Sequence, residues 1–191
     1  MYKRQPSWPG NQPHSTAGTP SFLDAEPGVL RYTEGVFTGH RWYDARGIEP
    51  AFPFGFGLGY TTWAVSTPVA PAPVAAGEVA EVRVRVANTG VRNGRGVVQV
   101  YVGHPGAAAP SPLRQLRAFE KVVLDPGASR ELTFALGMRD LARWDGRADA
   151  WVADAGEHLV WAGTSSREVG EPATLVLTER WSAPASAPLG A

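Results

Sequence analysis

The chain of 191 residues has the length of one domain, or of one domain with a substantial extra segment. Its 18 Lys and Arg residues balance 18 Asp and Glu residues, so neither nucleic acid nor a membrane surface is expected as a partner. The chain has no cysteine, which excludes a disulfide scaffold and a thiolate metal site. Neither a signal peptide nor a membrane-spanning segment is expected, and the sequence leaves the compartment open.

Residues 1–60 are predicted to form a mostly irregular N-terminal arm. Proline and glycine are dense in this segment, which is typical of loops rather than of a self-sufficient core. The second half of the arm is nevertheless rich in aromatic side chains, which a disordered tail would lack. These are Tyr32, Phe37, Trp42, Tyr43, Phe52, Phe54, Phe56 and Tyr60. We therefore expect another surface to cover these rings.

A connector rich in proline and alanine follows the arm at residues 66–77 (STPVAPAPVAAG). The fixed φ angles of its prolines favour an extended linker or an edge strand. Beyond it the hydrophobic period becomes two, which indicates half-buried strands. Val82, Val84 and Val86 alternate with charged residues, so one face of this strand is aliphatic and the other is solvated. We place the domain boundary close to Thr61.

The same alternation predicts the remaining strands. They span residues 97–102, 116–124, 129–136, 150–152, 157–161 and 174–179, with one helical turn at residues 138–143. In the first of them, Val98, Val100 and Val102 share one face, and Gln99 and Tyr101 share the other. About seven short strands separated by frequent turns predict an all-β fold, an immunoglobulin-like β-sandwich. We assign the sandwich to residues 61–181 and a disordered tail to residues 182–191.

Two blocks of motifs give sharper information. The first comprises residues 32–44 (YTEGVFTGHRWYD) and 47–62 (GIEPAFPFGFGLGYTT), and the second includes residues 97–102 (VVQVYV) and 112–122 (PLRQLRAFEKV). The first block resembles the end of the α/β-sandwich domain of family 3 glycoside hydrolases, which include β-glucosidases. The second resembles the fibronectin-III-like domain of the same family. Phe56 departs from the family pattern, in which histidine is usual, so no polar role is carried over to that position.

The resemblance implies the C-terminal accessory portion of a retaining exo-glycosidase. In that family an aspartate nucleophile lies in an N-terminal barrel, and an acid/base carboxylate usually lies in the α/β-sandwich domain. Both lie upstream of the motifs found in this chain. We therefore assign no catalytic residue, no metal ligand and no cofactor, and expect the chain to be inactive alone. The expected partners are the barrel and α/β-sandwich domains of the parent enzyme, with carbohydrate as a further candidate.

Five residues of the arm are candidates for an interdomain contact or for the rim of an active site. They are Arg41, Trp42, Tyr43, Asp44 and Phe54. Trp42 and Tyr43 could form an apolar wall beside a sugar ring. Burial of both rings in the seam between the α/β domain and the sandwich is the favoured interpretation, because large side chains contribute most of the burial energy there.

The candidate carboxylates receive structural roles. Asp44 is expected to form an ion pair with Arg41 and Arg46. Asp140 is expected to cap the helical turn, and Asp145, which precedes a glycine, to hold a tight turn. Glu34 and Glu49 are the other two carboxylates considered, and a structural role is favoured over catalysis for each of the five.

A free-standing fibronectin-III-like module that binds carbohydrate or protein is the alternative function. A carbohydrate platform would use Trp144, Trp151 and Trp161, although the strand period favours burial for Trp161 and leaves Trp151 undecided. This alternative leaves the aromatic arm unexplained. The histidines show no metal-ligand spacing, so isolated polar roles are expected for them.

Overall fold

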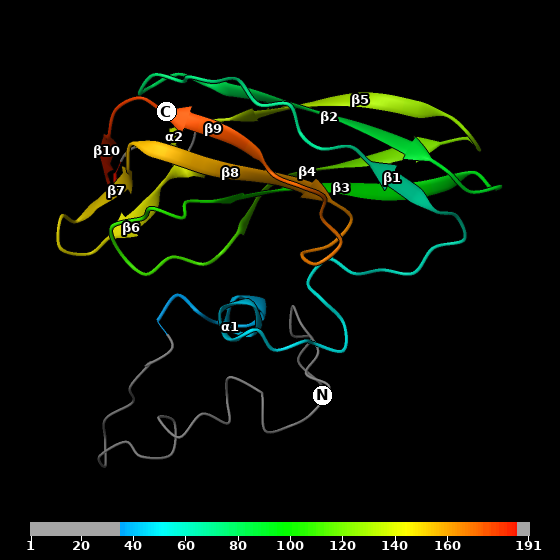
Figure 1. The fold of residues 1–191 in the computed structure, drawn as a ribbon, viewed down its shortest axis with the longest axis horizontal. Helices are drawn as coiled ribbons and strands as arrows, with labels where there is room; N and C mark the ends of the chain where they lie inside the picture. Colours follow the sequence, from blue (N-terminus) through cyan, green and yellow to red (C-terminus); the bar gives the residue numbers. More distant parts are fainter. Residues whose placement is uncertain (1–34, 187–191) are drawn as a thin grey trace, which may run out of the picture.

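The computed structural model describes residues 35–186, which form a β-sandwich with the arm lying against one of its outer faces (Figure 1). The prediction of an all-β sandwich is confirmed. The first 34 residues, with Tyr32 of the aromatic set, and residues 187–191 of the expected tail lie outside the described residues. No helix in the described part of the chain is long and apolar enough to cross a membrane.

Ten strands and two short helices make up the fold. In chain order they are α1 (His40–Arg46), β1 (Trp63–Val65), β2 (Ala80–Asn88), β3 (Gly94–Gly103), β4 (Gln115–Leu124), β5 (Ser129–Leu136), α2 (Met138–Leu141), β6 (Arg143–Asp145), β7 (Ala150–Ala153), β8 (Gly156–Gly163), β9 (Ala173–Leu177) and β10 (Trp181–Pro184). One layer is the sheet β1-β2-β5 and the other is the sheet β4-β3-β8-β9, and all their strand pairs are antiparallel. A small sheet, β10-β7-β6, lies at one end of the sandwich.

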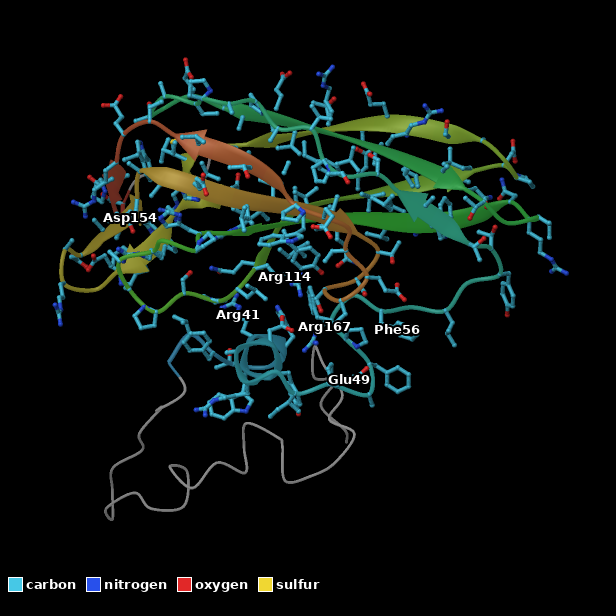
Figure 2. The ribbon with its side chains drawn as sticks, viewed as in Figure 1. Arg41, Glu49, Phe56, Arg114, Asp154 and Arg167 are labelled. Atoms are coloured by element: carbon cyan, nitrogen blue, oxygen red, sulfur yellow. The ribbon has the colours of Figure 1, made fainter. Side chains whose placement is uncertain are left out.

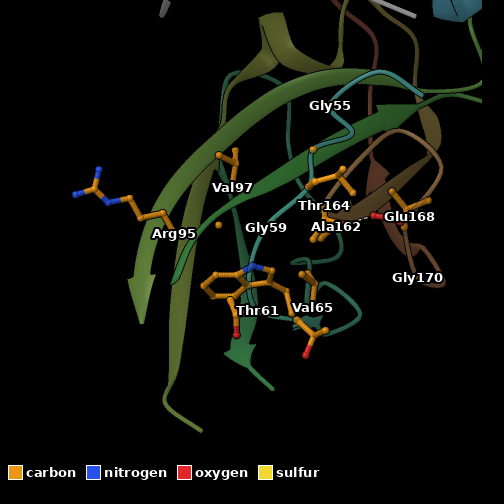
Figure 3. Close-up of a pocket in the computed structure, with 17 residues that line it drawn as sticks. Gly55, Gly59, Thr61, Val65, Arg95, Val97, Ala162, Thr164, Glu168 and Gly170 are labelled. Atoms are coloured by element: carbon orange, nitrogen blue, oxygen red, sulfur yellow. Dashed lines mark hydrogen bonds between the residues drawn. The ribbon is translucent and has the colours of Figure 1, made fainter. Parts of the chain in front are cut away.

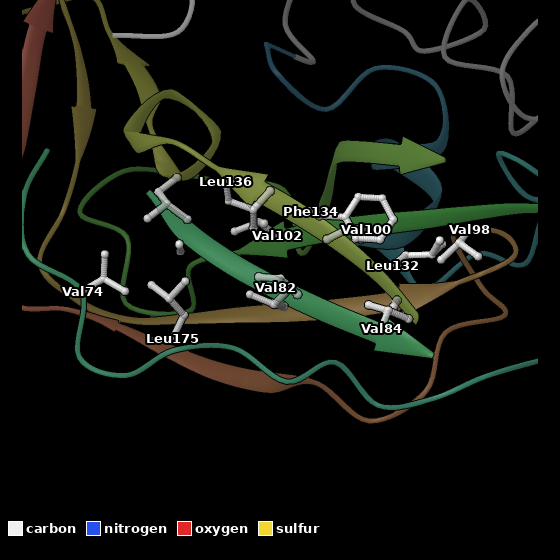
Figure 4. Packing of buried hydrophobic residues seen from close by; sticks show 14 of the residues in the cluster. Val74, Val82, Val84, Val98, Val100, Val102, Leu132, Phe134, Leu136 and Leu175 are labelled. Atoms are coloured by element: carbon white, nitrogen blue, oxygen red, sulfur yellow. The ribbon is translucent and has the colours of Figure 1, made fainter. Parts of the chain in front are cut away.

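The core between the two layers is almost entirely aliphatic (Figure 4). Val82, Val84 and Val86 of β2 are each at most 1% exposed, while the charged residues between them face solvent, as the alternation predicts. Leu132 of β5 and Leu175 of β9 pack against the same cluster from the two layers. Each such side chain contributes about 1.5–3 kcal/mol by leaving water, so this core holds the two layers together.

The connector at residues 66–77 runs along the edges of both layers. The Val69 N–H donates to the Arg83 carbonyl at 2.8 Å, which continues the edge of β2 beyond β1. Farther along, the Val74 N–H donates to the Val176 carbonyl at 2.9 Å, beside β9. Val74 is 3% exposed and belongs to the core. The prediction of an extended or edge-strand connector is confirmed.

The predicted strands are all present, and the residues of β5 coincide with the predicted range 129–136. The structure adds α1, β1 and β6, which are too short to give a periodic signal. It also adds β10, which pairs with β7 from Trp181 to Pro184. Ordered structure therefore continues past residue 181, where the sequence had suggested a disordered tail.

Candidate functional site

The arm begins its contact with the sandwich at helix α1, which is bounded by two glycines. Gly39 has φ 58° and Gly47 has φ 63°, values in the left-handed region that favours glycine. The Ile48 N–H donates to the Tyr43 carbonyl at 2.9 Å, which closes the last turn. The glycines thus restrict the helix to seven residues and turn the chain back along the sheet.

The five candidate residues of the arm lie on or beside α1. Tyr43 is 3% exposed and faces inward, as the interpretation of a buried seam predicts. Trp42 is half-buried, and the Arg46 guanidinium is 4.5 Å from its ring centroid. Phe54 stacks against the His40 ring, with the two centroids 4.6 Å apart. Burial is the main cause that lowers the pKa of His40, so the stack favours a neutral imidazole.

Asp44 makes the main polar contact between the arm and the sandwich. Its Oδ1 lies 2.8 Å from Nε of Arg167, a residue in the segment between β8 and β9, and its side chain is only 5% exposed. Arg167 also donates to the Ile48 carbonyl at 3.0 Å. The expected pairing of Asp44 with Arg41 and Arg46 is wrong. Asp44 points inward to the sheet, whereas Arg41 bonds to the Val36 carbonyl and Arg46 covers Trp42.

The loop after α1 is fastened to β3 and to the segment after β8. The Gln99 side-chain amide donates to the Thr164 carbonyl at 2.6 Å and to the Gly55 carbonyl at 3.4 Å. The Ser166 N–H donates to the Phe54 carbonyl at 2.8 Å. Gly55 has φ 82°, a conformation that favours glycine, and a Cβ at this position would collide with the side-chain amide of Gln99. A larger residue would therefore strain the backbone and displace either the Gln99 side chain or the loop.

These contacts bury the outer face of the sheet around Tyr101. The Tyr101 hydroxyl donates to Gln99 Oε1, and both residues are buried on the side of β3 that faces the arm. Burial strongly raises the pKa of the Tyr101 phenol, which stays neutral. The Arg114 guanidinium lies 5.7 Å from the Trp161 ring centroid, between α1 and the sheet (Figure 2). Trp161 is buried as predicted, but it lies on this outer face and not in the aliphatic core.

A cavity of about 640 Å³ opens between the arm loop and the sandwich (Figure 3). Glycines such as Gly59, Gly96 and Gly163 line much of it, so backbone groups form part of its walls. Glu168 contributes its carboxylate, which accepts a hydrogen bond of 2.7 Å from the Thr164 hydroxyl. Glu168 is the only carboxylate among the lining residues, so the cavity does not offer the two carboxyl groups that glycoside hydrolysis requires.

The other candidate carboxylates have the structural roles predicted for them. Asp140 accepts the Gly137 N–H at 2.9 Å and caps α2. Asp145 Oδ1 accepts the N–H groups of Arg147 and Ala148 at 3.0 and 3.3 Å, which forms the turn after β6. Within residues 35–186 no group of three or more His, Cys, Asp and Glu side chains could hold a metal ion.

The other two tryptophans of the candidate carbohydrate platform lie in the small sheet. Trp144 of β6 is 41% exposed, and its ring meets the Trp151 ring edge to face with the centroids 5.4 Å apart. The Arg139 guanidinium covers Trp151 at 3.9 Å from its centroid. Trp151 is therefore partly buried, which answers the question that the sequence left undecided, and Trp144 presents the accessible ring.

Sequence reasoning missed the residues of the sandwich that receive the arm. Gln99, Ser166 and Arg167 bind it, although no motif marks them as binding residues. The sequence of β3 nevertheless contained one indication that its outer face is covered. A glutamine and a tyrosine between valines give a face that is neither charged nor aliphatic, which suits a covered polar contact better than open solvent.

The fold and this docked arm define a fibronectin type III-like β-sandwich that carries an additional N-terminal segment. A model of the fibronectin type III-like domain family matches residues 96–166. The β-glucosidase of Rhizobium radiobacter is 41% identical over 150 residues, which are 78% of this chain and 18% of that protein. Thermostable β-glucosidase B of Acetivibrio thermocellus is 38% identical over 160 residues, which are 82% of this chain and 21% of that protein.

Solved structures agree with the sequence relatives. The GH3 β-glucosidase of Bifidobacterium adolescentis matches with a TM-score of 0.80 at 36% identity, over 96% of this chain and 26% of that chain. β-Glucosidase 3B of Thermotoga neapolitana, solved with glucose, matches with a TM-score of 0.73 at 38% identity, over 80% of this chain and 21% of that chain. The chain corresponds to the C-terminal region of family 3 glycoside hydrolases. It spans about a fifth of the length of the curated relatives it matches.

Proposed function

We propose that this chain is the C-terminal accessory portion of a β-glucosidase-type enzyme, which hydrolyses O-glycosyl bonds in carbohydrate metabolism. Its role in that enzyme is structural, in bracing the catalytic barrel and the α/β-sandwich domain. The main support for this proposal is the sequence similarity to β-glucosidases, which align with most of this chain over only about a fifth of their own length. The rest of such an enzyme is large enough to contain the catalytic machinery.

The exposed side of the arm supports a role in docking. Leu58 and Tyr60 are 92% and 91% exposed, and the neighbouring rings of Phe52 and Phe56 are 52% and 37% exposed. The last two rings lie 5.5 Å apart and form one apolar surface. Exposed apolar groups that cluster in this way mark contacts with other protein surfaces. The catalytic domains are the partner that this proposal assigns to them.

The carboxylates support the absence of independent catalysis. A retaining glycosidase needs two carboxyl groups about 5 Å apart, one of them with a raised pKa. Asp44 is held by Arg167, Asp140 by a helix cap and Asp145 by a turn. The turn N–H groups are the main cause that lowers the pKa of Asp145, which is opposite to what a general acid requires. The proposal therefore assigns catalysis to the parent enzyme.

A chimera tests this function. The matching C-terminal region of the Rhizobium radiobacter β-glucosidase is replaced by this chain, and hydrolysis of an aryl β-glucoside is measured. We expect the chimera to be soluble and active, the same enzyme without the region to lose activity, and this chain alone to show no turnover. Turnover by the chain alone, or full activity of the truncated enzyme, would contradict the proposal.

Carbohydrate binding by the small sheet is a second candidate, favoured by one observation. The accessible ring of Trp144 is held edge to face by Trp151, so it offers a rigid aromatic surface to the C–H face of a sugar. Titration with β-glucan oligosaccharides, followed by tryptophan fluorescence, tests this function. Saturable binding that Trp144→Ala abolishes and Phe119→Ala preserves would support it, since Phe119 is exposed on a different sheet.

A further inference from the structure

Two histidines face each other where β3 ends beside β8. Gly103, the last residue of β3, is paired with Leu159, which brings the following His104 next to His158. Their rings are stacked, with the centroids 4.3 Å apart and an angle of 15° between the planes. His158 is completely buried, with 0% of its surface exposed. A stacked histidine pair with one fully buried ring is unusual and requires a physical explanation.

The hydrogen bonds of the pair fix the protonation of each ring. His104 Nδ1 lies 2.7 Å from the Glu157 carbonyl oxygen, and His158 Nε2 lies 3.0 Å from the Asp154 carbonyl oxygen. A carbonyl oxygen can only accept, so both of these nitrogens carry a proton. In the neutral rings the opposite nitrogens, Nε2 of His104 and Nδ1 of His158, are then acceptors.

Both histidines line a small cavity that has polar and apolar walls. Its volume is about 20 Å³, and its lining includes His104, Gln115, Arg117, Arg143, Asp154 and His158. His104 Nε2, His158 Nδ1 and Arg117 Nε are buried and have no hydrogen-bond partner within the described residues. They comprise two acceptors and one donor, which match the two hydrogens and one lone pair of a water molecule. A cavity of this volume that offers such polar groups can hold one water.

A metal ion fits this arrangement less well. The ligating lone pairs lie in the ring planes, and two nearly parallel planes about 4 Å apart do not converge at the 2.0–2.1 Å of a metal–nitrogen bond. The longer hydrogen bonds of a water molecule span that separation. The guanidinium groups of Arg117 and Arg143, which line the same cavity, also disfavour a cation.

Burial likewise disfavours a proton on the His158 ring. Arg117 and Arg143 are both cationic, and the Asp154 carboxylate is already paired with Arg143 at 3.1 Å and with Arg180 at 3.7 Å. Arg117 donates to the Ala142 carbonyl at 3.0 Å and so remains beside the cavity. Burial is the largest cause that lowers the pKa of His158, and the neighbouring His104 lowers it further. The folded protein thus favours a neutral imidazole at His158.

We propose that His104, His158 and Arg117 form a proton-sensitive clasp, in which two neutral rings and one guanidinium bind a single buried water. Mildly acidic solution opens the clasp and loosens this end of the sandwich. Because the pKa of His158 is lower in the folded chain than the ordinary value of about 6.5, the unfolded chain binds the proton at higher pH. The stabilisation is complete above that value and is lost as the pH falls below it.

The test follows the folding equilibrium of the full chain by denaturant titration between about pH 7.5 and pH 5, on either side of the ordinary histidine pKa. As the pH falls below about 6.5, we expect the equilibrium constant for unfolding to rise by up to about tenfold per pH unit. His104→Asn and His158→Gln each keep the donor to the carbonyl and remove one ring of the clasp, and both should flatten this dependence. Arg130→Gln, which changes an exposed ion pair on β5, should leave the dependence unchanged.

Nitrogen NMR of the unmodified chain decides the matter if the variants do not fold. At neutral pH, Nδ1 of His104 and Nε2 of His158 should carry the protons, with slow exchange between Arg117 Nε–H and a long-lived water. The opposite protonation pattern, the absence of that water signal, or titration of His158 at or above its ordinary pKa would overturn the proposal. An unchanged pH dependence in both variants would also overturn it.

Discussion

The inner and the outer faces of the sandwich are stabilised by different means. On the inner side, β2 and β3 are alike, since both present alternating valines to one aliphatic cluster. On the outer side they differ, because β2 exposes charged residues while β3 buries Gln99 and Tyr101 beneath the arm. The comparison shows that alternation in the sequence is enough to predict which residues of a strand face the core. What covers the other face depends on a distant segment.

The largest expected effect is on the inner face. Leu132→Ala removes a side chain that is 2% exposed, and we expect it to lower the free energy of unfolding by about 2–5 kcal/mol. Denaturant unfolding followed by tryptophan fluorescence measures the loss. Glu81→Ala, on the exposed face of β2, is the matched control and should change stability by less than about 0.5 kcal/mol. Equal losses in the two variants would remove the distinction between the faces.

The outer face is tested at Gly55. Gly55→Ala places a methyl group against Gln99 at a φ that disfavours alanine, and should cost about 1–3 kcal/mol. The loop should detach, so the Ser166 amide should lose its protection from hydrogen exchange. Gly57→Ala is the control, because a Cβ at Gly57 meets no atom within 4 Å. Retained protection in Gly55→Ala would show that the fit at Gln99 does not hold the arm.

The ion pair between Asp44 and Arg167 should contribute less. A double-mutant cycle with Asp44→Asn and Arg167→Gln should give a coupling of about 1 kcal/mol, since the Arg167 side chain is 33% exposed and partly screened. The same cycle for Glu120 and Arg130, whose side chains are 36% and 57% exposed, should give a coupling near zero. A larger coupling for the second pair would contradict the role of burial.

The smallest expected effect is the pH dependence of the arm. Burial lowers the pKa of His40, so its contribution is complete above the ordinary pKa of about 6.5 and declines as the pH falls below it. Hydrogen exchange at the Ser166 amide should therefore accelerate in mild acid, after correction for the intrinsic rate. His40→Phe keeps an aromatic stack with Phe54 and should remove the dependence. If the dependence persists in this variant, His40 is not its cause.

The sequence predicted the parts of the fold that follow from local alternation and turn chemistry. The residues of β5 and the aliphatic face of β2 are such cases, since each needs only neighbouring residues to be recognised. Helix α1 was missed because its seven residues are held by flanking glycines and by contacts with the sheet. The same limitation applies to β10, whose strand depends on pairing with β7.

In the candidate site too, contacts between neighbouring residues could be predicted from the sequence, whereas contacts between distant segments could not. Burial of Tyr43 could be expected from the aromatic content of the arm. The partner of Asp44 could not, because Arg167 lies far along the chain and only the folded topology brings the two together. The roles of Asp140 and Asp145 were predictable since both bind backbone groups within three residues.

The connector at residues 66–77 has a consequence for the protein in concentrated solution. Unpaired strand edges are templates on which a second chain can add its own strand, which leads to aggregation. Val69 occupies part of the edge of β2, and Val74 occupies part of the edge of β9. The prolines around them have no N–H to offer to an incoming strand. The connector thus protects one edge of each layer from pairing with another chain.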